Sequence, residues 1–229
     1  MNYELRIMRK CLFLLTAATA FVAVAGDNEY WTKGEVSAAL GHGFKLGVEE
    51  ELRFDAHRLY DEETTFFLGY TVCPYLSVQG GYRLVRERSK HLGPFRTEHR
   101  PLADIIVTAP EFWTLKFDYR SRFEWRDKQH DLGYFRLRER LRLRTSWSVT
   151  DFKISPYGSL EAFLSNKPHS HSSDSFDRLR SQVGVSFKPV PSIPELGMNA
   201  YYMVQHGVSS KSEDWEPTNV FGLEFSYMF

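Results

Sequence analysis

Five arginines occupy every second position of residues 135–147, FRLRERLRLRTSW. Apolar side chains hold most of the alternate positions: Phe135, Leu137, Leu141, Leu143 and Trp147. On a helix, steps of two residues turn by about 200° and would scatter these arginines around the axis. On a β-strand, successive side chains point to opposite faces, so the arginines share one face and the apolar residues share the other. The segment therefore predicts a β-strand with one cationic and one apolar face.

The same two-residue period recurs along most of the chain. It predicts ten strands: residues 44–55, 64–72, 76–84, 96–109, 113–126, 135–147, 153–164, 176–188, 196–206 and 219–229. Most connections alternate between tight turns and longer polar loops, which is typical of an antiparallel meander. No linker divides this part of the chain, so we expect a single domain.

Alternation by itself leaves three folds open. A soluble barrel or a β-sandwich would turn the apolar face inward, whereas a membrane barrel would turn it outward. The alternating segments are longer than the roughly 5–6 residues of a mean soluble strand and cover the roughly 9–11 residues that cross a bilayer. Aromatic residues also bracket the apolar faces, as in the girdles of membrane barrels. The mean hydropathy of −0.39 is no objection, because polar and apolar residues cancel in such strands.

We therefore predict an all-β fold, an antiparallel up-and-down transmembrane β-barrel of about ten strands, with twelve strands as the alternative. Residues 31–40, WTKGEVSAAL, complicate the count because they would make an eleventh strand, and bacterial barrels usually have an even number. This segment either pairs as part of a hairpin or lies partly inside the lumen.

Residues 1–25 have the features of a secretory signal peptide, in which basic residues precede an apolar run at 11–25 that ends in small residues. Met8 is an alternative start. We expect residues 26–229 to form the mature domain in the bacterial outer membrane. Its one cysteine, Cys73, gives no intrachain disulfide.

The arginines of the strands are expected to line the lumen, because each would cost about 2–4 kcal/mol on the lipid face at the bilayer midplane. The predicted cationic wall comprises Arg120, Arg122, Arg126, Arg136, Arg138, Arg140, Arg142, Arg144, Arg178 and Arg180. The predicted counter-charges in the lumen are Glu49, Glu51, Asp118, Glu124 and Glu161. Glu50 and Glu139 instead fall on the apolar face, where they either pair with neighbouring residues or lie near a rim of the barrel.

Two interpretations of this interior remain open. Small barrels fill their interiors with side chains, so the charges can brace a closed lumen through salt bridges. Alternatively, the arginines line a narrow hydrated pore that guides anions, because charged linings set the selectivity of channels. The second interpretation implies a small anionic solute as a partner, whereas a net charge of zero gives no general footprint for nucleic acid.

Several segments resemble a bacterial family known as domain of unknown function 2490: WTKGEVSAAL, EEELRF, YRSRFEWR, RLRERLRLR, SPYGSLEAF, RLRSQVGVSF and NVFGLEFSYMF. The resemblance covers essentially the whole mature chain and implies an outer-membrane barrel without an assigned activity. The arginine pattern also resembles, more loosely, the narrow porins for acidic oligosaccharides. The last segment places Phe225, Tyr227 and Phe229 in step, which resembles the C-terminal assembly signal of outer-membrane barrels. The assembly machinery, the lipid bilayer and lipopolysaccharide are the implied partners.

The expected loops offer little for catalysis. Residues 169–175, HSHSSDS, combine Ser, His and Asp, but a catalytic triad is defined by geometry, and His-x-His lacks a third metal ligand at a recognisable spacing. Asp61, Glu62 and Glu63 fall in an expected loop, where acidic residues keep the chain hydrated or bind cations. We expect no enzyme activity, no metal and no cofactor.

Overall fold

The protein is described here from a computed structural model, which covers residues 28–55, 58–88, 93–129, 131–149, 152–166, 176–190, 193–208 and 215–229. The expected signal peptide, residues 1–25, lies outside the described residues and stays a prediction. Within the described ranges the chain forms eleven long strands and one short strand. They are β1 (Glu29–Gly41), β2 (Phe44–Asp55), β3 (Arg58–Cys73), β4 (Leu76–Glu87), β5 (Arg96–Thr108), β6 (Leu115–Lys128), β7 (Tyr134–Thr145), β8 (Trp147–Val149), β9 (Phe152–Ser165), β10 (Phe176–Phe187), β11 (Leu196–Val208) and β12 (Trp215–Met228).

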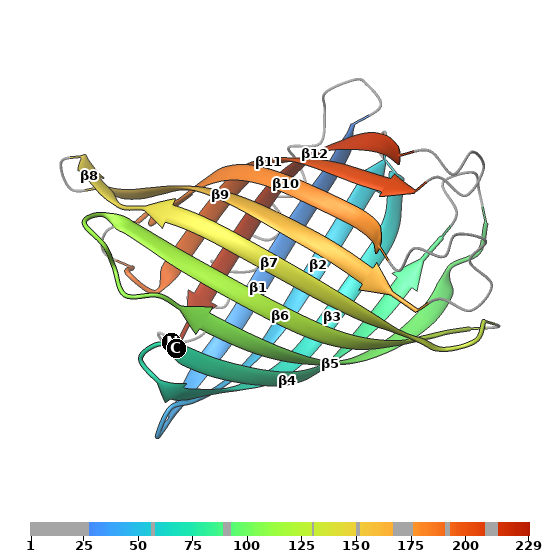
Figure 1. Ribbon diagram of the computed structural model, residues 1–229, viewed down its shortest axis with the longest axis horizontal. Coiled ribbons are helices and arrows are strands. Elements are labelled where there is room, and N and C mark those ends of the chain that lie inside the picture. Colours follow the sequence, from blue (N-terminus) through green and yellow to red (C-terminus); the bar gives the residue numbers. More distant parts are fainter. Residues whose placement is uncertain are drawn as a thin grey trace, which may run out of the picture.

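The strands form one sheet that closes into a barrel (Figure 1). Long strands that follow one another along the chain pair antiparallel, including β9 with β10. The closing pair is different: β1 runs parallel to β12, with Thr32 opposite Leu223 and Val36 opposite Tyr227. The fold is thus an all-β, mostly antiparallel closed barrel.

The prediction of ten strands is wrong. Residues 29–41 do not lie inside the lumen, and they need no additional strand as a partner. They form β1, which lies in the wall between β12 and β2. The short β8 adds no position to the wall, since β7 and β8 both pair with β9 and follow one another along it. Eleven positions remain. An odd number makes the first and last strands run in the same direction, which is why the closing pair is parallel.

Two further expectations about β-structure need correction. The strand predicted at residues 113–126 is β6, and it begins at Leu115 instead of at Trp113. Trp113 has a φ of 59° and stacks on Phe112 in the preceding turn. The run Asp61–Glu63 is not in a loop, because β3 begins at Arg58 and includes it.

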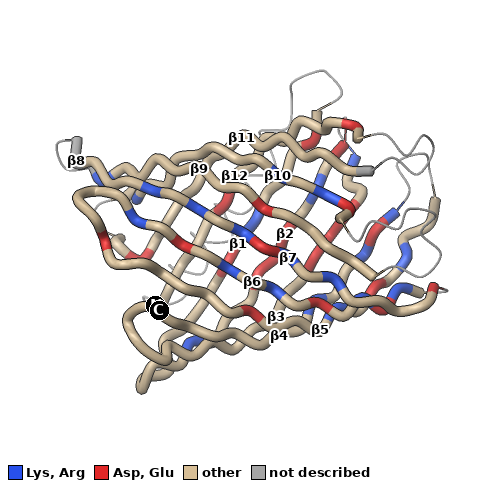
Figure 2. The backbone as a smooth tube through the Cα atoms, viewed as in Figure 1, with Lys and Arg blue, Asp and Glu red and all other residues tan. Residues whose placement is uncertain are grey.

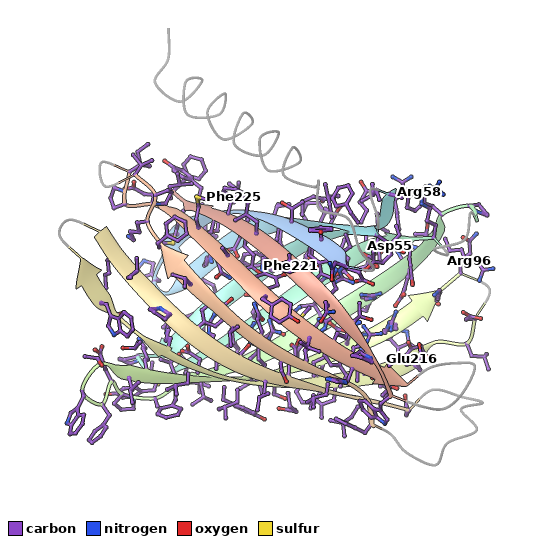
Figure 3. All side chains as sticks on the ribbon, turned by 90° about the horizontal axis from the view of Figure 1, so that it is seen from above. Asp55, Arg58, Arg96, Glu216, Phe221 and Phe225 are labelled. Atoms are coloured by element: carbon purple, nitrogen blue, oxygen red, sulfur yellow. The ribbon has the colours of Figure 1, made fainter. Side chains whose placement is uncertain are left out.

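The two ends of the barrel differ in their connections. At the end that we call the turn end, short connections join the strands, such as residues 42–43 and 74–75. Gly41, His42 and Gly43 all have positive φ in the first of these turns, a backbone region that glycine enters without strain. The opposite, loop end carries Asp55, Arg58, Arg96 and Glu216 (Figure 3).

Side chains sort by polarity across the wall. Exposed on the outer face are large apolar residues of every long strand, among them Val48, Phe66, Tyr82, Ile105, Phe123, Leu141, Leu160, Val183, Tyr202 and Phe221. Charged residues alternate with them and lie along the middle of the strands as well as at their ends (Figure 2). In the described part of the chain there is no helix with the length and apolarity to cross a membrane.

A small apolar cluster packs inside the barrel beside the closing pair of strands. Trp31, Met203 and Val220 are buried together, with Tyr201 against them. Gly222 lies opposite Trp31 on β12, and a Cβ atom there would stand 1.9 Å from the Tyr201 ring. The glycine therefore makes room for the tyrosine at the seam.

Candidate functional site: the charged lumen

The arginine ladder of β7 faces the arginines and acids of β6 in register. Arg136 lies opposite Glu124, and Arg142 lies opposite Asp118. Between them, two arginines of β7 lie opposite arginines of β6: Arg138 opposite Arg122 and Arg140 opposite Arg120. Like charges directly across a strand pair are destabilising unless other groups neutralise them, so the neighbouring walls must supply carboxylates.

Glu63 is a buried carboxylate that gathers three arginines. It is 1% exposed and pairs with Arg53 at 3.0 Å, with Arg83 at 2.5 Å and with Arg100 at 3.0 Å. Arg100 also donates two hydrogen bonds to Glu98, at 2.7 and 3.0 Å. Glu63 therefore ties its own strand, β3, to β2, β4 and β5.

Glu124 and Glu161 gather the arginines of the other wall. Glu124 is fully buried and accepts hydrogen bonds from Arg136, at 2.5 and 2.8 Å, and from Arg138 at 3.0 Å. Arg138 also reaches Glu161 at 3.1 Å, and Arg180 lies 3.5 Å from the same carboxylate. These shared carboxylates link β6, β7, β9 and β10.

Two buried aromatic rings complete this part of the lumen. The Trp31 ring lies between Arg53, at 4.1 Å, and Arg180, at 4.7 Å. Phe163, 1% exposed, contacts Arg180 at 4.7 Å and Arg138 at 4.8 Å. A desolvated cation–π contact contributes about 2 kcal/mol. Because Trp31 belongs to β1 and Arg180 to β10, this stacking joins two strands that are not neighbours in the sheet.

We call this set the ion-pair layer: Trp31, Arg53, Glu63, Arg83, Glu98, Arg100, Glu124, Arg126, Arg136, Arg138, Glu161, Phe163 and Arg180. It occupies mainly the half of the lumen nearer the loop end, since Trp31 is close to the start of β1 and Phe163 close to the end of β9. A side chain that lines a water-filled pore is accessible to water. Glu63, Glu98 and Glu124 are at most 1% exposed, so the neighbouring side chains of the layer cover these carboxylates and none of the three lines a water-filled path.

The other half of the lumen is a cavity of about 670 Å³, which we call the turn-end chamber. Glu111, Thr114 and Lys188 of the turns line it, so it opens at the turn end. Its charged lining comprises ten basic and five acidic residues: Lys33, Lys45, Lys116, Arg120, Arg122, Arg140, Arg142, Arg144, Lys153 and Lys188, with Glu35, Glu49, Asp104, Glu111 and Glu224. The chamber therefore carries a net positive charge.

The predicted site residues lie in these two regions. Arg126, Arg136, Arg138 and Arg180 are in the ion-pair layer; Arg120, Arg122, Arg140, Arg142 and Arg144 line the chamber; Arg178 packs against Phe163 at 5.6 Å, beside the layer. The predicted counter-charges pair as follows: Glu49 with Lys33 and Arg83, Glu51 with Arg53, Asp118 with Arg142 and Arg144, Glu124 with Arg136 and Arg138, and Glu161 with Arg120, Arg138 and Arg180.

Sequence reasoning missed Glu63, which pairs with three arginines, and the two lumenal rings of Trp31 and Phe163. The sequence predicts a loop at Glu63, because three consecutive acidic residues are typical of a solvent-exposed segment. The period that places Phe67 and Thr65 on one face of β3 also includes Glu63, so extending the strand toward the loop end would have found it.

The two acids on the outer face have hydroxyl partners. Glu139 accepts hydrogen bonds from Ser121 at 2.7 Å and from the Tyr119 hydroxyl. Glu50 accepts one from Thr64 at 2.6 Å. All three donors belong to neighbouring strands: Ser121 and Thr64 lie directly opposite their carboxylates, and Tyr119 lies two residues from Ser121 on β6.

The remaining predicted residues play no part in the lumen's charge network. Phe225 lies near the turn end (Figure 3), and Tyr227 packs edge-on against Phe229 with ring centroids 4.8 Å apart. Their role in assembly stays a prediction. The loop at 169–175 lies outside the described residues. Among the residues that the structure does describe, no group of His, Cys, Asp and Glu could hold a metal ion.

Comparison with known proteins supports both the family and the fold. The model of the family "Protein of unknown function (DUF2490)" matches residues 28–216. A solved NanC porin has a similar structure, with a TM-score of 0.51 and 14% sequence identity over 85% of this chain and 91% of that chain. This likeness shows a shared porin-like fold. No curated protein matches the chain. Because the family model covers most of the sequence, the chain belongs to the family of proteins of unknown function DUF2490.

Proposed function

We propose that this protein is a transmembrane barrel of the bacterial outer membrane and acts as a narrow, anion-favouring channel or binding pore for small acidic solutes. The turn-end chamber carries this proposal, because ten basic residues face five acidic ones around about 670 Å³. Charged linings of this kind set the selectivity of membrane pores. In the membrane, the exposed apolar side chains would contact lipid and the short turns would face the periplasm.

The ion-pair layer is the constriction of the proposed channel. Eleven strands lie between barrels of about 8 strands, whose interiors are filled by side chains, and porins of about 16–18 strands with wide aqueous channels. Passage of a solute requires the layer to rearrange. Arg138, which pairs with both Glu124 and Glu161, can release one of these carboxylates and still keep the other.

Conductance across planar lipid bilayers tests the channel. We expect discrete current steps and, in a salt gradient, a reversal potential displaced toward the anion equilibrium potential. Replacing Arg140, Arg142 and Arg144 together by serine should reduce the anion preference, because it removes three cations from the chamber lining. Arg86→Ser is the control, since Arg86 is on the outer face and pairs there with Glu62. An anion preference that survives the triple change contradicts the assigned role of the ladder.

A closed, structural barrel is the second candidate, favoured by the burial of the ion-pair layer. Its shared carboxylates and stacked rings would then serve to brace the wall. A purified, folded barrel that inserts into bilayers and gives no current above background would support this candidate and contradict the channel.

A further inference from the structure

One arginine of the ladder differs from the other four. Arg136 and Arg138 pair with Glu124 at one end of β7, and Arg142 and Arg144 pair with Asp118 at the other. Arg140 lies between these two pairs, half-buried, and within the described residues it makes no ion pair and no side-chain hydrogen bond.

The neighbouring strands do not neutralise Arg140. Its partner in register on β6 is Arg120, a like charge. Its partner on β9 is Glu161, which already pairs with Arg120 at 2.7 Å, with Arg138 at 3.1 Å and with Arg180 at 3.5 Å. One carboxylate is therefore surrounded by four guanidinium groups, and the excess positive charge lies on the side of the chamber.

Three of the acids elsewhere in the chamber lining also have cationic partners of their own. Asp104 receives two hydrogen bonds from Arg122, at 2.6 and 2.7 Å. Glu224 pairs with Lys33 at 3.1 Å, and Glu49 lies 3.8 Å from the same lysine. In the described part of the chain, none of these three acids lies within ion-pair distance of Arg140.

We propose that Arg140 is the centre of an anion-binding site in the turn-end chamber, flanked by Arg120 and Arg142, for a small solute that carries a carboxylate or phosphate group. Guanidinium groups bind both oxyanions through paired hydrogen bonds. The chamber has the volume of a small-molecule site, for which about 300–1,000 Å³ is usual. The solute enters from the turn end, because residues of the turns line the mouth of the chamber there. The site rests on the function proposed for the chamber, but binding does not need the lumen to conduct.

Titration calorimetry of the purified barrel in detergent tests this site, with inorganic phosphate and citrate as the probes at constant ionic strength. We expect Arg140→Ser to weaken binding at least about tenfold, because it removes charge-assisted hydrogen bonds. Arg140→Lys should recover part of the affinity. Lys153→Ser is the matched control, because it removes the same charge from the same lining near its turn-end mouth, and we expect a change below about threefold.

A second measurement keeps the test independent of folding defects. A saturating probe should raise the thermal midpoint of the unmodified barrel, because a ligand that binds only the folded state stabilises it, and should leave that of the folded Arg140→Ser barrel unchanged. Binding of phosphate alone or of citrate alone supports the site and identifies the group it prefers. Absence of binding by both probes, or equal losses in Arg140→Ser and Lys153→Ser, overturns it.

The outcome separates this site from the channel. A barrel that binds the probes through Arg140 without conducting retains the site and loses the channel. A barrel that conducts anions while Arg140→Ser binds both probes like the unmodified protein retains the channel and loses the site.

Discussion

Adjacent residues of β3 have opposite environments because side chains alternate across the wall. Glu63 points into the ion-pair layer and holds three arginines, whereas Glu62 points outward to Arg86, which is 52% exposed in its side chain. A buried carboxylate that neutralises several guanidinium groups is costly to remove, since the remaining charges stay in a medium that solvates them poorly. An exposed pair contributes little, because water screens it.

Glu63→Gln should therefore lower the free energy of unfolding by about 3–5 kcal/mol, the range for breaking a buried ion pair. Glu62→Gln, the matched control one residue away, should change it by about 0–1 kcal/mol. Urea titration of each barrel refolded into lipid vesicles, followed by tryptophan fluorescence, measures both values. Similar losses in the two variants would mean that Glu63 is hydrated and that the layer is open.

At the scale of the elements, the parallel pairing of β1 with β12 is what closes the barrel. The two strands come from opposite ends of the described chain, with Glu29 opposite Val220 and Ser37 opposite Met228. Every other long strand pair in the wall is antiparallel, so the direction of this seam follows from the number of strands.

Cysteine pairs test the direction of the seam in a Cys73→Ser background. In the parallel register, Thr32→Cys with Leu223→Cys and Val36→Cys with Tyr227→Cys should each form a disulfide, because directly paired residues lie within disulfide reach. The exchanged combinations, Thr32 with Tyr227 and Val36 with Leu223, should not. Mass spectrometry of the unreduced protein identifies the cross-links. Cross-linking of the exchanged combinations would indicate an antiparallel seam and an even number of strands.

At the scale of the whole molecule, every proposal for the lumen depends on which face of the barrel wall points inward. The outer face exposes apolar side chains of all the long strands, while the carboxylates and most guanidinium groups of the ion-pair layer are buried inside. In a bilayer this arrangement places hydrocarbon against acyl chains and keeps the charges from lipid, where each arginine would cost about 2–4 kcal/mol.

Tryptophan quenching by brominated lipids measures this orientation. Trp125 is 38% exposed on the outer face and Trp31 is 6% exposed inside. In vesicles with bromine on the acyl chains, a variant that retains Trp125 alone should be quenched strongly, and one that retains Trp31 alone should be nearly unaffected. Strong quenching of Trp31 with little quenching of Trp125 would mean that the arginine face contacts lipid, which would exclude a charged lumen.

The sequence determined the local part of this structure. A period of two in residues 113–126 and 135–147 predicts strands with one charged and one apolar face, and the structure places nearly all of these residues in β6, β7 and β8 with their arginines in the lumen. The cost of placing an arginine against lipid is set by the side chain and its depth in the bilayer and not by the neighbouring strands, so the charged face of a single strand suffices to orient the wall.

Only the tertiary structure decided which charges meet. Glu63 contacts three arginines because β2, β4 and β5 bring one arginine each to it. Arg140 has no ion-pair partner among the described residues because the register of β6, β7 and β9 places Arg120 and an already shared Glu161 beside it. The strand count followed in the same way from the closure of β1 on β12. Pairing and closure bring together segments that are far apart in the chain, and the alternation along one strand carries no information about its neighbour's register.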